Sequence, residues 1–345
     1  MSEPATLATF TTLRLGGTAR HLVEVTNEEQ TLAAVRSADP VLILAGGSNV
    51  VVADEGFPGT VVLLRQRGID VHNEDGTVTL TVAAGHPWDE VVETAVVNGW
   101  SGIESLSGIP GSAGATPIQN VGAYGQEVAE TITQVRVFDR QRDEVVSLPA
   151  GDCGFAYRTS VFKHNDRFVV LSVSFRLLAS PLSTPIRYAE LARTLGVEPG
   201  ATAPLDAVRD AVLKLRAGKG MVIDPADRDT YSVGSFFTNP VVSPDDFERV
   251  RGAAAQFGEP PSWPGGDGTV KLSAAWLIER AGFRKGYGRE GSGVALSGKH
   301  TLALTNRGTG STAALLDLAR EIREGVESRF GVVLHPEPVL VNCAL

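Results

Sequence analysis

Three polar side chains that interrupt apolar or aromatic segments are the strongest candidates for chemistry. Arg158 lies in CGFAYRTSVFKH, Ser235 lies in YSVGSFFTNPVV, and Glu337 lies in HPEPVLV. A polar group surrounded by apolar side chains is costly unless it is hydrogen-bonded, paired or functional. A buried ion pair and a turn hydroxyl would also explain these residues, so each pattern alone leaves a structural and a catalytic role open.

A glycine-rich turn offers a possible anion site near the start of the chain. In LILAGGSNVVVAD, two apolar runs meet across Gly46, Gly47, Ser48 and Asn49. Glycine reaches backbone conformations closed to other residues, and successive main-chain N–H groups in such a turn can converge on a pyrophosphate. An ordinary tight hairpin would show the same pattern. We therefore expect either a phosphate-binding turn or a hairpin here.

A second glycine-rich segment, SGIPGSAGATPIQNVGAYGQ, covers residues 107–126. It has too few bulky side chains for a core strand, but its backbone can approach a flat ligand closely. A long surface loop is the structural alternative. Loops of this length are usually functional or disordered, and the interleaved Ile109, Ile118 and Tyr124 argue against disorder.

The common nucleotide-binding fingerprints are absent. GVALSGKHT, with Lys299, has the glycine and lysine spacing of a P-loop, but His300 stands where a Ser or Thr should hold magnesium. The strand-like TLALTN follows it where a helix is required. No GxGxxG opens a strand-to-helix unit, so a dinucleotide would not bind here in a Rossmann domain.

The elements that must position these residues form an α+β pattern. Within residues 1–180, β-branched runs of strand length alternate with turn residues: HLVEV, VLILA, VVVAD, TVVLL, VTLTVAA, VRVFD and FVVLSVSFRL. One helix is expected to begin at Asn27, where acidic residues fill the first turn, and another to run from Pro87 to Gly99.

The second half of the sequence is richer in helix. Helical spacing of apolar residues predicts helices over 205–215 and 315–326, the latter ending at Gly331. Ser243 is expected to cap a third helix, and KLSAAWLIERAG forms a fourth. We place the module boundary near residues 178–185, where proline and serine follow a strong strand.

Composition narrows the class of protein. Of 345 residues, 43% are hydrophobic and 21% charged, which is typical of a globular protein. The net charge of -9 argues against nonspecific nucleic-acid binding, which needs a basic face. Cys153 and Cys343 form no CxxC pair, so we expect no metal site and no disulfide. No apolar segment has the length that crosses a bilayer, and we expect a cytoplasmic chain without a membrane partner.

Taken jointly and in this order, the motifs resemble those of UDP-N-acetylenolpyruvoylglucosamine reductases, enzymes of peptidoglycan precursor synthesis. The resemblance covers nearly the whole chain and includes AGGSNVVVAD, IPGSAGATPIQNVGAYG, CGFAYRTSVFKH, GSFFTNPVV, VKLSAAWLIE and the final PE pair. It implies an α+β fold with a two-lobed FAD-binding domain of the vanillyl-alcohol-oxidase (PCMH) type over 5–180, its lobes covering about 5–65 and 66–180. A C-terminal α+β substrate-binding domain over 181–345 follows, and its final strand returns to the active site.

The resemblance also implies a reaction. NADPH, acting through FAD, would reduce UDP-N-acetylglucosamine enolpyruvate to UDP-N-acetylmuramate, entering the substrate cleft first and leaving before the sugar nucleotide binds. Hydride reaches the terminal carbon of the enol ether, Arg158 and Glu337 stabilise the resulting enolate, and Ser235 donates a proton to the adjacent carbon. We expect a monomer whose partners are the sugar nucleotide and NADPH.

Further residues match binding positions of that family. Those matching FAD positions are Gly46, Gly47, Ser48, Asn49, Ile109, Gly111, Ala115, Thr116, Ile118, Asn120 and Gly122. Those matching substrate positions are Tyr157, Tyr188, Arg216, Lys219, Asn239, Lys285 and His300. Trp263 stands where tyrosine is frequent, and Val339 stands where arginine often follows the catalytic glutamate. One polar substrate contact and one FAD contact are therefore expected to differ.

Tyr188, in PLSTPIRYAELARTLG, implies membership of the group in which a tyrosine-bearing loop folds over the substrate pyrophosphate. A surface tyrosine leading a helix is the alternative. Two rival functions also remain open. An oxidase of the same flavin fold would pass electrons to oxygen, and such enzymes often tether FAD through His or Cys, which neither glycine-rich segment contains. A noncatalytic nucleotide-binding module would tolerate loss of the Ser235 hydroxyl.

Overall fold

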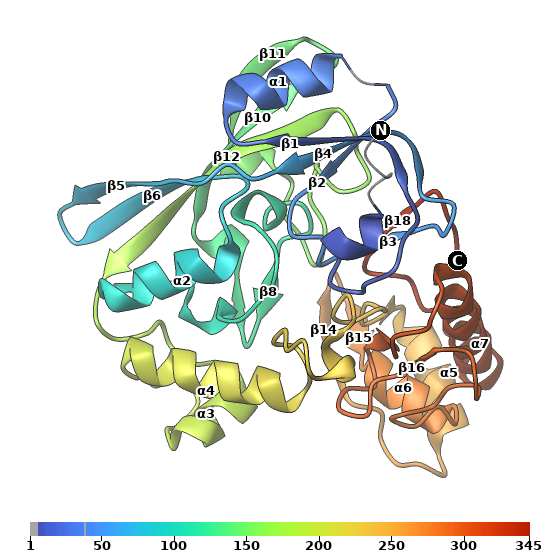
Figure 1. Cartoon of the computed structure of the whole chain (residues 1–345). Coiled ribbons are helices and arrows are strands. Elements are labelled where there is room, and N and C mark those ends of the chain that lie inside the picture. Colours follow the sequence, from blue (N-terminus) through green and yellow to red (C-terminus); the bar gives the residue numbers. More distant parts are fainter. Residues whose placement is uncertain (1–5, 38) are drawn as a thin grey trace. The chain divides into compact units, whose positions relative to one another are not determined.

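The computed structural model describes residues 6–37 and 39–345, which divide into two compact units (Figure 1). The sheet unit comprises residues 19–47 and 58–222. The C-terminal unit comprises residues 6–18, 48–57 and 223–345. The chain therefore passes between the units within the glycine-rich turn, between Gly47 and Ser48.

Two sheets form the framework of the sheet unit. The larger has the strand order β11-β10-β12-β6-β5, with β7 pairing to β12, and the smaller has the order β1-β4-β2. Alternate residues of β6, namely Val78, Leu80 and Val82, are buried, as expected for a strand with one face against a core. The strands are β1 Ala19–Val25, β2 Val41–Leu44, β4 Phe57–Leu64, β5 Ile69–Glu74, β6 Thr77–Ala83, β7 Trp100–Ser101, β10 Ile132–Asp139, β11 Glu144–Pro149 and β12 Phe168–Ala179.

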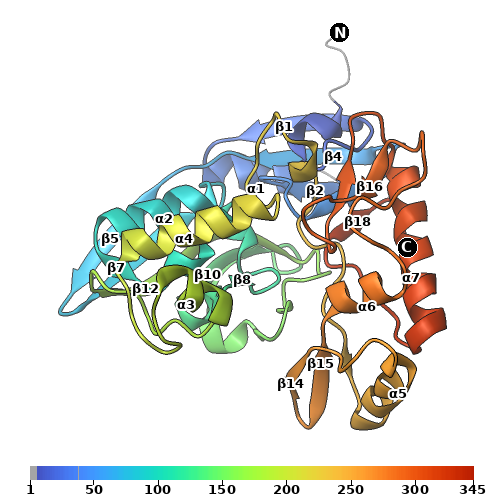
Figure 2. The same ribbon diagram turned by 90° about the horizontal axis from the view of Figure 1, so that it is seen from below.

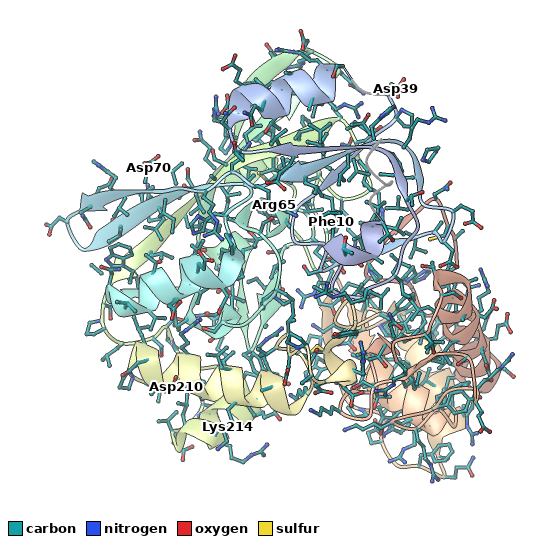
Figure 3. The ribbon with its side chains drawn as sticks, viewed as in Figure 1. Phe10, Asp39, Arg65, Asp70, Asp210 and Lys214 are labelled. Atoms are coloured by element: carbon teal, nitrogen blue, oxygen red, sulfur yellow. The ribbon has the colours of Figure 1, made fainter. Side chains whose placement is uncertain are left out.

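The described part of this unit contains four α-helices, of which the first begins at a side-chain cap. The Asn27 side chain accepts a hydrogen bond from the Gln30 N–H at 2.9 Å and caps the first of them. On α4, Val208 and Val212 are buried, whereas Asp210 and Lys214 are exposed on its outer face (Figure 3). The helices are α1 Glu28–Arg36, α2 Trp88–Val97, α3 Ala189–Leu195 and α4 Leu205–Gly218.

The segment after β12 does not behave as a linker. Residues 181–222 pack with the sheet unit, where α4 lies beside α2 (Figures 1 and 2). Arg209 on α4 forms a bidentate ion pair with Asp89 on α2, with N···O distances of 2.7 and 2.9 Å. The division by contacts thus falls after Val222, whereas the sequence predicted a boundary at 180. The proline and serine residues shape an ordered connection, in which the Leu205 N–H donates to the Pro181 carbonyl.

The C-terminal unit has its own apolar core, built around one long helix. That helix, α7, begins after the cap Ser311 and ends at Gly331, whose φ of 68° is left-handed and favours glycine. The α-helices and strands of this unit are β3 Val50–Val52, β13 Val241–Val242, α5 Pro244–Ala254, β14 Ser262–Gly266, β15 Thr269–Leu272, α6 Ala274–Arg280, β16 Val294–Leu296, β17 Leu304–Asn306, α7 Thr312–Phe330 and β18 Val339–Val341. The last strand pairs in parallel with β3.

The expected strands and helices are present, together with further strands and one further α-helix, α3. The strands β5 and β11 and the helix α3 were not predicted from the sequence. The two strands are largely exposed and carry polar residues, so their apolar patterns are weak. None of the helices within residues 6–37 and 39–345 combines the length and apolar character needed to cross a membrane. Cys153 and Cys343 are both free thiols.

A carboxylate at the end of β10 provides a pH-dependent test of this fold. Hydrogen bonds from Arg167, at 2.9 and 2.5 Å, lower the pKa of Asp139 from 3.8 to about 2, and the N–H groups of Gln141 and Arg142 add to the effect. Because the folded-state pKa is depressed, the stabilisation is present above pH 3.8 and is lost as the pH falls toward 2.

We therefore expect Asp139→Asn to unfold at lower denaturant concentration than the unsubstituted protein at pH 7. This difference should shrink as the pH is lowered from 4 toward 2. Denaturant unfolding, followed by circular dichroism at several pH values, measures it. A difference that stays constant over this range would contradict the assigned pKa shift.

Candidate functional site

The two glycine-rich segments, predicted separately, meet in the sheet unit. A Cβ placed on Gly46 would lie 2.6 Å from Gly111 Cα and 3.1 Å from the Gly111 carbonyl carbon. Such a contact between two main chains leaves no space for any side chain at Gly46. The flanking strands also exclude the hairpin alternative, because β2 pairs with β4 while β3 pairs with β18.

Arg65, which follows β4, fixes the entry to this turn (Figure 3). Its Nη1 donates to the Ala45 carbonyl at 2.9 Å and to the Leu64 carbonyl at 3.0 Å. Ala45 directly precedes Gly46, so the guanidinium holds the end of β2 in place. Arg65 was not predicted as a site residue, because nothing in its local sequence shows that it reaches a carbonyl twenty residues away.

The second segment is held by its own main chain. The N–H groups of Ala113 and Gly114 donate to the carbonyls of His86 and Ala84, both at 2.9 Å. A Cβ on Gly114 would lie 2.5 Å from Ala84 Cβ, so this approach also requires glycine. The carbonyl of Ile118 accepts a hydrogen bond from the Ser160 hydroxyl at 2.7 Å. The predicted long loop is thus an ordered strip of backbone.

Arg158 lies against the end of this strip. Its Nη2 donates to the Gly122 carbonyl at 2.7 Å, and its Nη1 donates to the Asn120 carbonyl at 3.3 Å. Glu127 approaches the guanidinium at 3.8 Å, and the Tyr157 ring lies 5.2 Å from it. Arg158 also has a φ of 52°, which is unfavourable for a residue with a side chain and marks a tightly constrained position.

Asn120 links the same groups. Its Nδ2 donates to Glu127 at 2.8 Å and to the Ala156 carbonyl at 3.2 Å, while its Oδ1 accepts from the Ala129 N–H at 3.1 Å. Asn120 is buried and has a φ of 47°. The structure therefore brings together Asn120 and Arg158, which the sequence assigned to FAD binding and to catalysis.

Two tyrosines and a lysine form a second cluster of the sheet unit. Tyr188, which precedes α3, meets the ring of Tyr124 edge-on with centroids 5.4 Å apart. Lys219 Nζ lies 5.6 Å from the Tyr124 ring and donates to Glu190 at 2.6 Å. Burial alone would lower the pKa of Lys219, but the hydrogen bond to Glu190 raises it above its ordinary value. A cation is therefore maintained beside Tyr188, while Tyr124 was absent from the predicted site residues.

Arg216 contributes a second cation to this region. Its Nη2 donates to the Met221 carbonyl at 3.0 Å, whereas its Nε is buried and has no hydrogen-bond partner among the described residues. Burial lowers the pKa of Arg216. A buried donor without a partner is costly and suits a site that accepts an oxygen ligand.

Ser235 and Glu337 are brought together in the C-terminal unit. The Glu337 N–H donates to the Phe236 carbonyl at 2.8 Å, and Phe237 bridges to Pro336, so the two segments run side by side. The Val339 N–H donates to the Asn49 carbonyl at 3.0 Å. Two residues of the glycine-rich turn, Ser48 and Asn49, therefore belong to the same unit as this pair.

The remaining predicted substrate residues are dispersed within the C-terminal unit. Asn239 Oδ1 accepts from the Ala274 N–H at 3.0 Å, at the start of α6. Lys285 is exposed, and His300 lies in the turn between β16 and β17. Trp263 is 48% exposed on β14.

The P-loop alternative is excluded by geometry. Lys299 Nζ forms a 2.5 Å ion pair with Asp227, and the segment joins the antiparallel strands β16 and β17 with no helix after it. Within residues 6–37 and 39–345, no group of three His, Cys, Asp or Glu side chains is arranged to hold a metal ion.

Comparison with known proteins agrees with this geometry. Residues 19–148 match a family described as FAD binding domain, and residues 224–341 match the C-terminal domain of UDP-N-acetylenolpyruvoylglucosamine reductase. Proteins named UDP-N-acetylenolpyruvoylglucosamine reductase from Salinispora arenicola and Thermobifida fusca are 62% and 55% identical to the chain. Each alignment covers 98% of this chain, and 95% and 97% of the respective relatives.

The chain belongs to the UDP-N-acetylenolpyruvoylglucosamine reductase family. It is an FAD-dependent oxidoreductase of that family. The crystal structure of UDP-N-acetylenolpyruvylglucosamine reductase from Thermus caldophilus matches 98% of both chains with a TM-score of 0.68 at 24% identity. The expected fold, an α+β chain with a PCMH-type FAD-binding domain and a C-terminal domain, is thereby confirmed.

The residues of the sheet unit fit the cofactor of this family. Gly46 is packed against the main chain of Gly111, and Gly114 is packed against Ala84, so neither position has space for a side chain. Exposed N–H groups in such turns suit a pyrophosphate, and a flat backbone strip suits a planar ring system. Gly46, Gly47, Gly111, Ala115, Thr116, Ile118, Asn120 and Gly122 all belong to this unit.

The close contact between the two loops predicts that replacing Gly46 by alanine abolishes flavin binding. Gly46→Ala introduces a Cβ that collides with the Gly111 main chain, so one loop must move away and FAD binding should be lost. The ratio of flavin to protein absorbance after purification measures it. Gly151→Ala is the matched control, since that Cβ would meet no atom within 4 Å.

Circular dichroism should show both variants folded. A Gly46→Ala protein that keeps its full complement of flavin would contradict the assignment of this turn.

Proposed function

We propose that the protein reduces UDP-N-acetylglucosamine enolpyruvate to UDP-N-acetylmuramate, with NADPH as electron donor. The observation that carries the proposal is 62% identity, over 98% of the chain, to a protein named for this reductase activity. The donor, a monomeric state and a cytoplasmic location belong to the same proposal. The chain is strongly acidic overall, with a net charge of -9, so the anionic substrate needs local cations.

Lys219 and Arg216 are assigned to the anionic part of the sugar nucleotide. Both lie in the sheet unit near Tyr124, and the buried Arg216 Nε has no partner among the described residues. A phosphate oxygen would satisfy that donor. Tyr188 and Tyr157 complete the proposed substrate contacts in this unit, while Asn239, Lys285 and His300 are assigned to the substrate from the C-terminal unit.

Charge stabilisation is assigned to Arg158 and Glu337. The chemistry that FAD would supply when bound is transfer of a hydride to the terminal carbon of the enolpyruvyl group. The adjacent carbon then carries negative charge shared with its carboxylate, which a preorganised guanidinium stabilises. Arg158 is preorganised because the carbonyls of Asn120 and Gly122 already hold its Nη atoms. Glu337, when protonated, donates a hydrogen bond to the same substrate carboxylate.

Ser235 is assigned as the proton donor to that carbon. Its hydroxyl is partly exposed and makes no hydrogen bond within the part of the chain that the structure describes. The assignment is supported by the backbone around Ser235, which lies beside the segment that carries Glu337. A serine hydroxyl is a weak acid, so the cation at Arg158 or an ordered water must make the transfer feasible.

Ser235→Ala separates the two halves of the reaction. We expect NADPH to reduce the flavin at a rate close to that of the unsubstituted protein, since no proton from Ser235 is needed. Turnover of the sugar nucleotide should fall by about 100-fold or more, the usual contribution of a positioned general acid. Stopped-flow flavin absorbance measures both rates.

Ser328→Ala, an exposed position on α7, is the matched control and should change neither rate. If the two half-reactions of Ser235→Ala slowed together, the proton-donor assignment would be wrong. If neither slowed, a noncatalytic role for Ser235 would follow.

A further inference from the structure

Glu104 is a fully buried carboxylate that the proposed reaction does not use. It lies in the 3-10 turn Glu104–Leu106 and is 0% exposed. It accepts hydrogen bonds from the Gly102 N–H at 2.6 Å, the Thr184 N–H at 2.9 Å and Gln126 Nε2 at 2.9 Å. Within residues 6–37 and 39–345, it forms no salt bridge with a Lys, Arg or His side chain.

A carboxylate without a cation is costly to bury, so its hydrogen bonds must hold it in a well-defined place. All three neighbouring groups are hydrogen-bond donors, and they point at both carboxylate oxygens of Glu104. Both oxygens must therefore act as acceptors. Glu104 therefore joins three stretches of chain: its own turn, the strand that carries Gln126 and the segment that begins at Thr184.

Gln126 is fixed at both ends of its amide. Its Oε1 accepts from the Ser105 N–H at 2.7 Å, and its Nε2 donates to Glu104 and to Thr184 Oγ1, the latter at 2.8 Å. Gln126 is buried in β9 (Gln126–Glu127), which pairs with β8 (Gly122–Ala123). The turn of this hairpin contains Tyr124.

The segment from Thr184 to Tyr188 lies along the same hairpin. A Cβ on Gly125 would lie 3.5 Å from both Arg187 Cβ and the Tyr188 nitrogen, an ordinary van der Waals contact. Tyr188 then meets Tyr124 edge-on, beside Lys219. The spacing between the two tyrosines is thus set by the turn at Gly125 and by the Glu104 hydrogen bonds behind it.

We propose that Glu104 is a positioning residue for the sugar nucleotide, locking hairpin 122–127 to segment 184–188. These hydrogen bonds fix the positions of Tyr188 and Lys219 relative to Gly122. The carbonyl of Gly122 accepts a hydrogen bond from Arg158. Glu104 touches no substrate and acts through Gln126 and Thr184. This inference rests on the proposed function, because Tyr188 and Lys219 are its substrate contacts.

Glu104→Gln tests the lock without changing side-chain volume. One acceptor oxygen becomes an NH₂ group that must face a donor N–H, so at least one hydrogen bond to the buried group is lost. We expect the KM for the sugar nucleotide to rise about tenfold, the loss typical of a hydrogen bond to a charged group. The kcat, the bound flavin and the rate of flavin reduction by NADPH should stay close to those of the unsubstituted protein.

The double variant Glu104→Gln with Gln126→Glu reverses the carboxylate–amide pair and should recover part of the KM. Glu130→Gln is the matched control, since Glu130 is an exposed carboxylate paired with Arg187 near the same hairpin. It should leave the KM unchanged. If Glu104→Gln fails to fold, Thr184→Val, which removes only the Oγ1 contacts, takes its place and should raise the KM less strongly.

A KM for Glu104→Gln equal to that of the unsubstituted protein would overturn the proposal, as would an equal KM for Thr184→Val in its place. An equal fall in flavin content, kcat and substrate affinity would also overturn it by showing a general structural role. Absence of turnover in the unsubstituted, flavin-loaded protein would instead refute the proposed function, so the two failures are distinguishable.

Discussion

The contact of two main chains at Gly46 and Gly111 is the constraint on which the proposed cofactor site depends. A side chain at Gly46 would collide with the Gly111 backbone, so the two loops come together only as bare peptide. Arg65 holds the carbonyl just before Gly46, and hydrogen bonds to the carbonyls of Ala84 and His86 hold the segment after Gly111. A close contact between two main chains is the kind of backbone surface that a dinucleotide flavin is expected to approach.

Two arginines near that backbone, Arg158 and Arg216, have features that lower the local stability of the fold. Arg158 has a left-handed backbone conformation, and its guanidinium donates hydrogen bonds to two main-chain carbonyls. The Nε atom of Arg216 is buried and has no partner among the described residues. Such features are expensive in a folded protein and are expected where a ligand completes them. In the proposed function, these locally fixed cations are the groups that bind an anionic sugar nucleotide to an otherwise acidic chain.

Local patterns in the sequence were sufficient for most α-helices, for strands with a strong apolar pattern such as β6 and β12, and for the two glycine-rich segments. The cap at Asn27 and the stop at Gly331 follow from side-chain and backbone chemistry within one turn. The packing of residues 181–222 with the sheet unit could not be read in this way, because the ion pair between Asp89 and Arg209 joins α2 to a helix more than a hundred residues later. Arg65, Tyr124 and Glu104 were missed for the same reason, since their roles arise only from tertiary contacts. The catalytic roles of Arg158, Ser235 and Glu337 came from resemblance and stay predictions.

The most direct test of the central claim, that electrons pass from NADPH through the flavin to the enolpyruvyl group, is an anaerobic single-turnover measurement on the unsubstituted protein. Flavin absorbance should bleach on addition of NADPH and return on addition of UDP-N-acetylglucosamine enolpyruvate, with mass spectrometry showing a product two hydrogens heavier. A flavin that stays bleached with the sugar nucleotide and recovers only when oxygen is admitted would contradict the account and identify an oxidase.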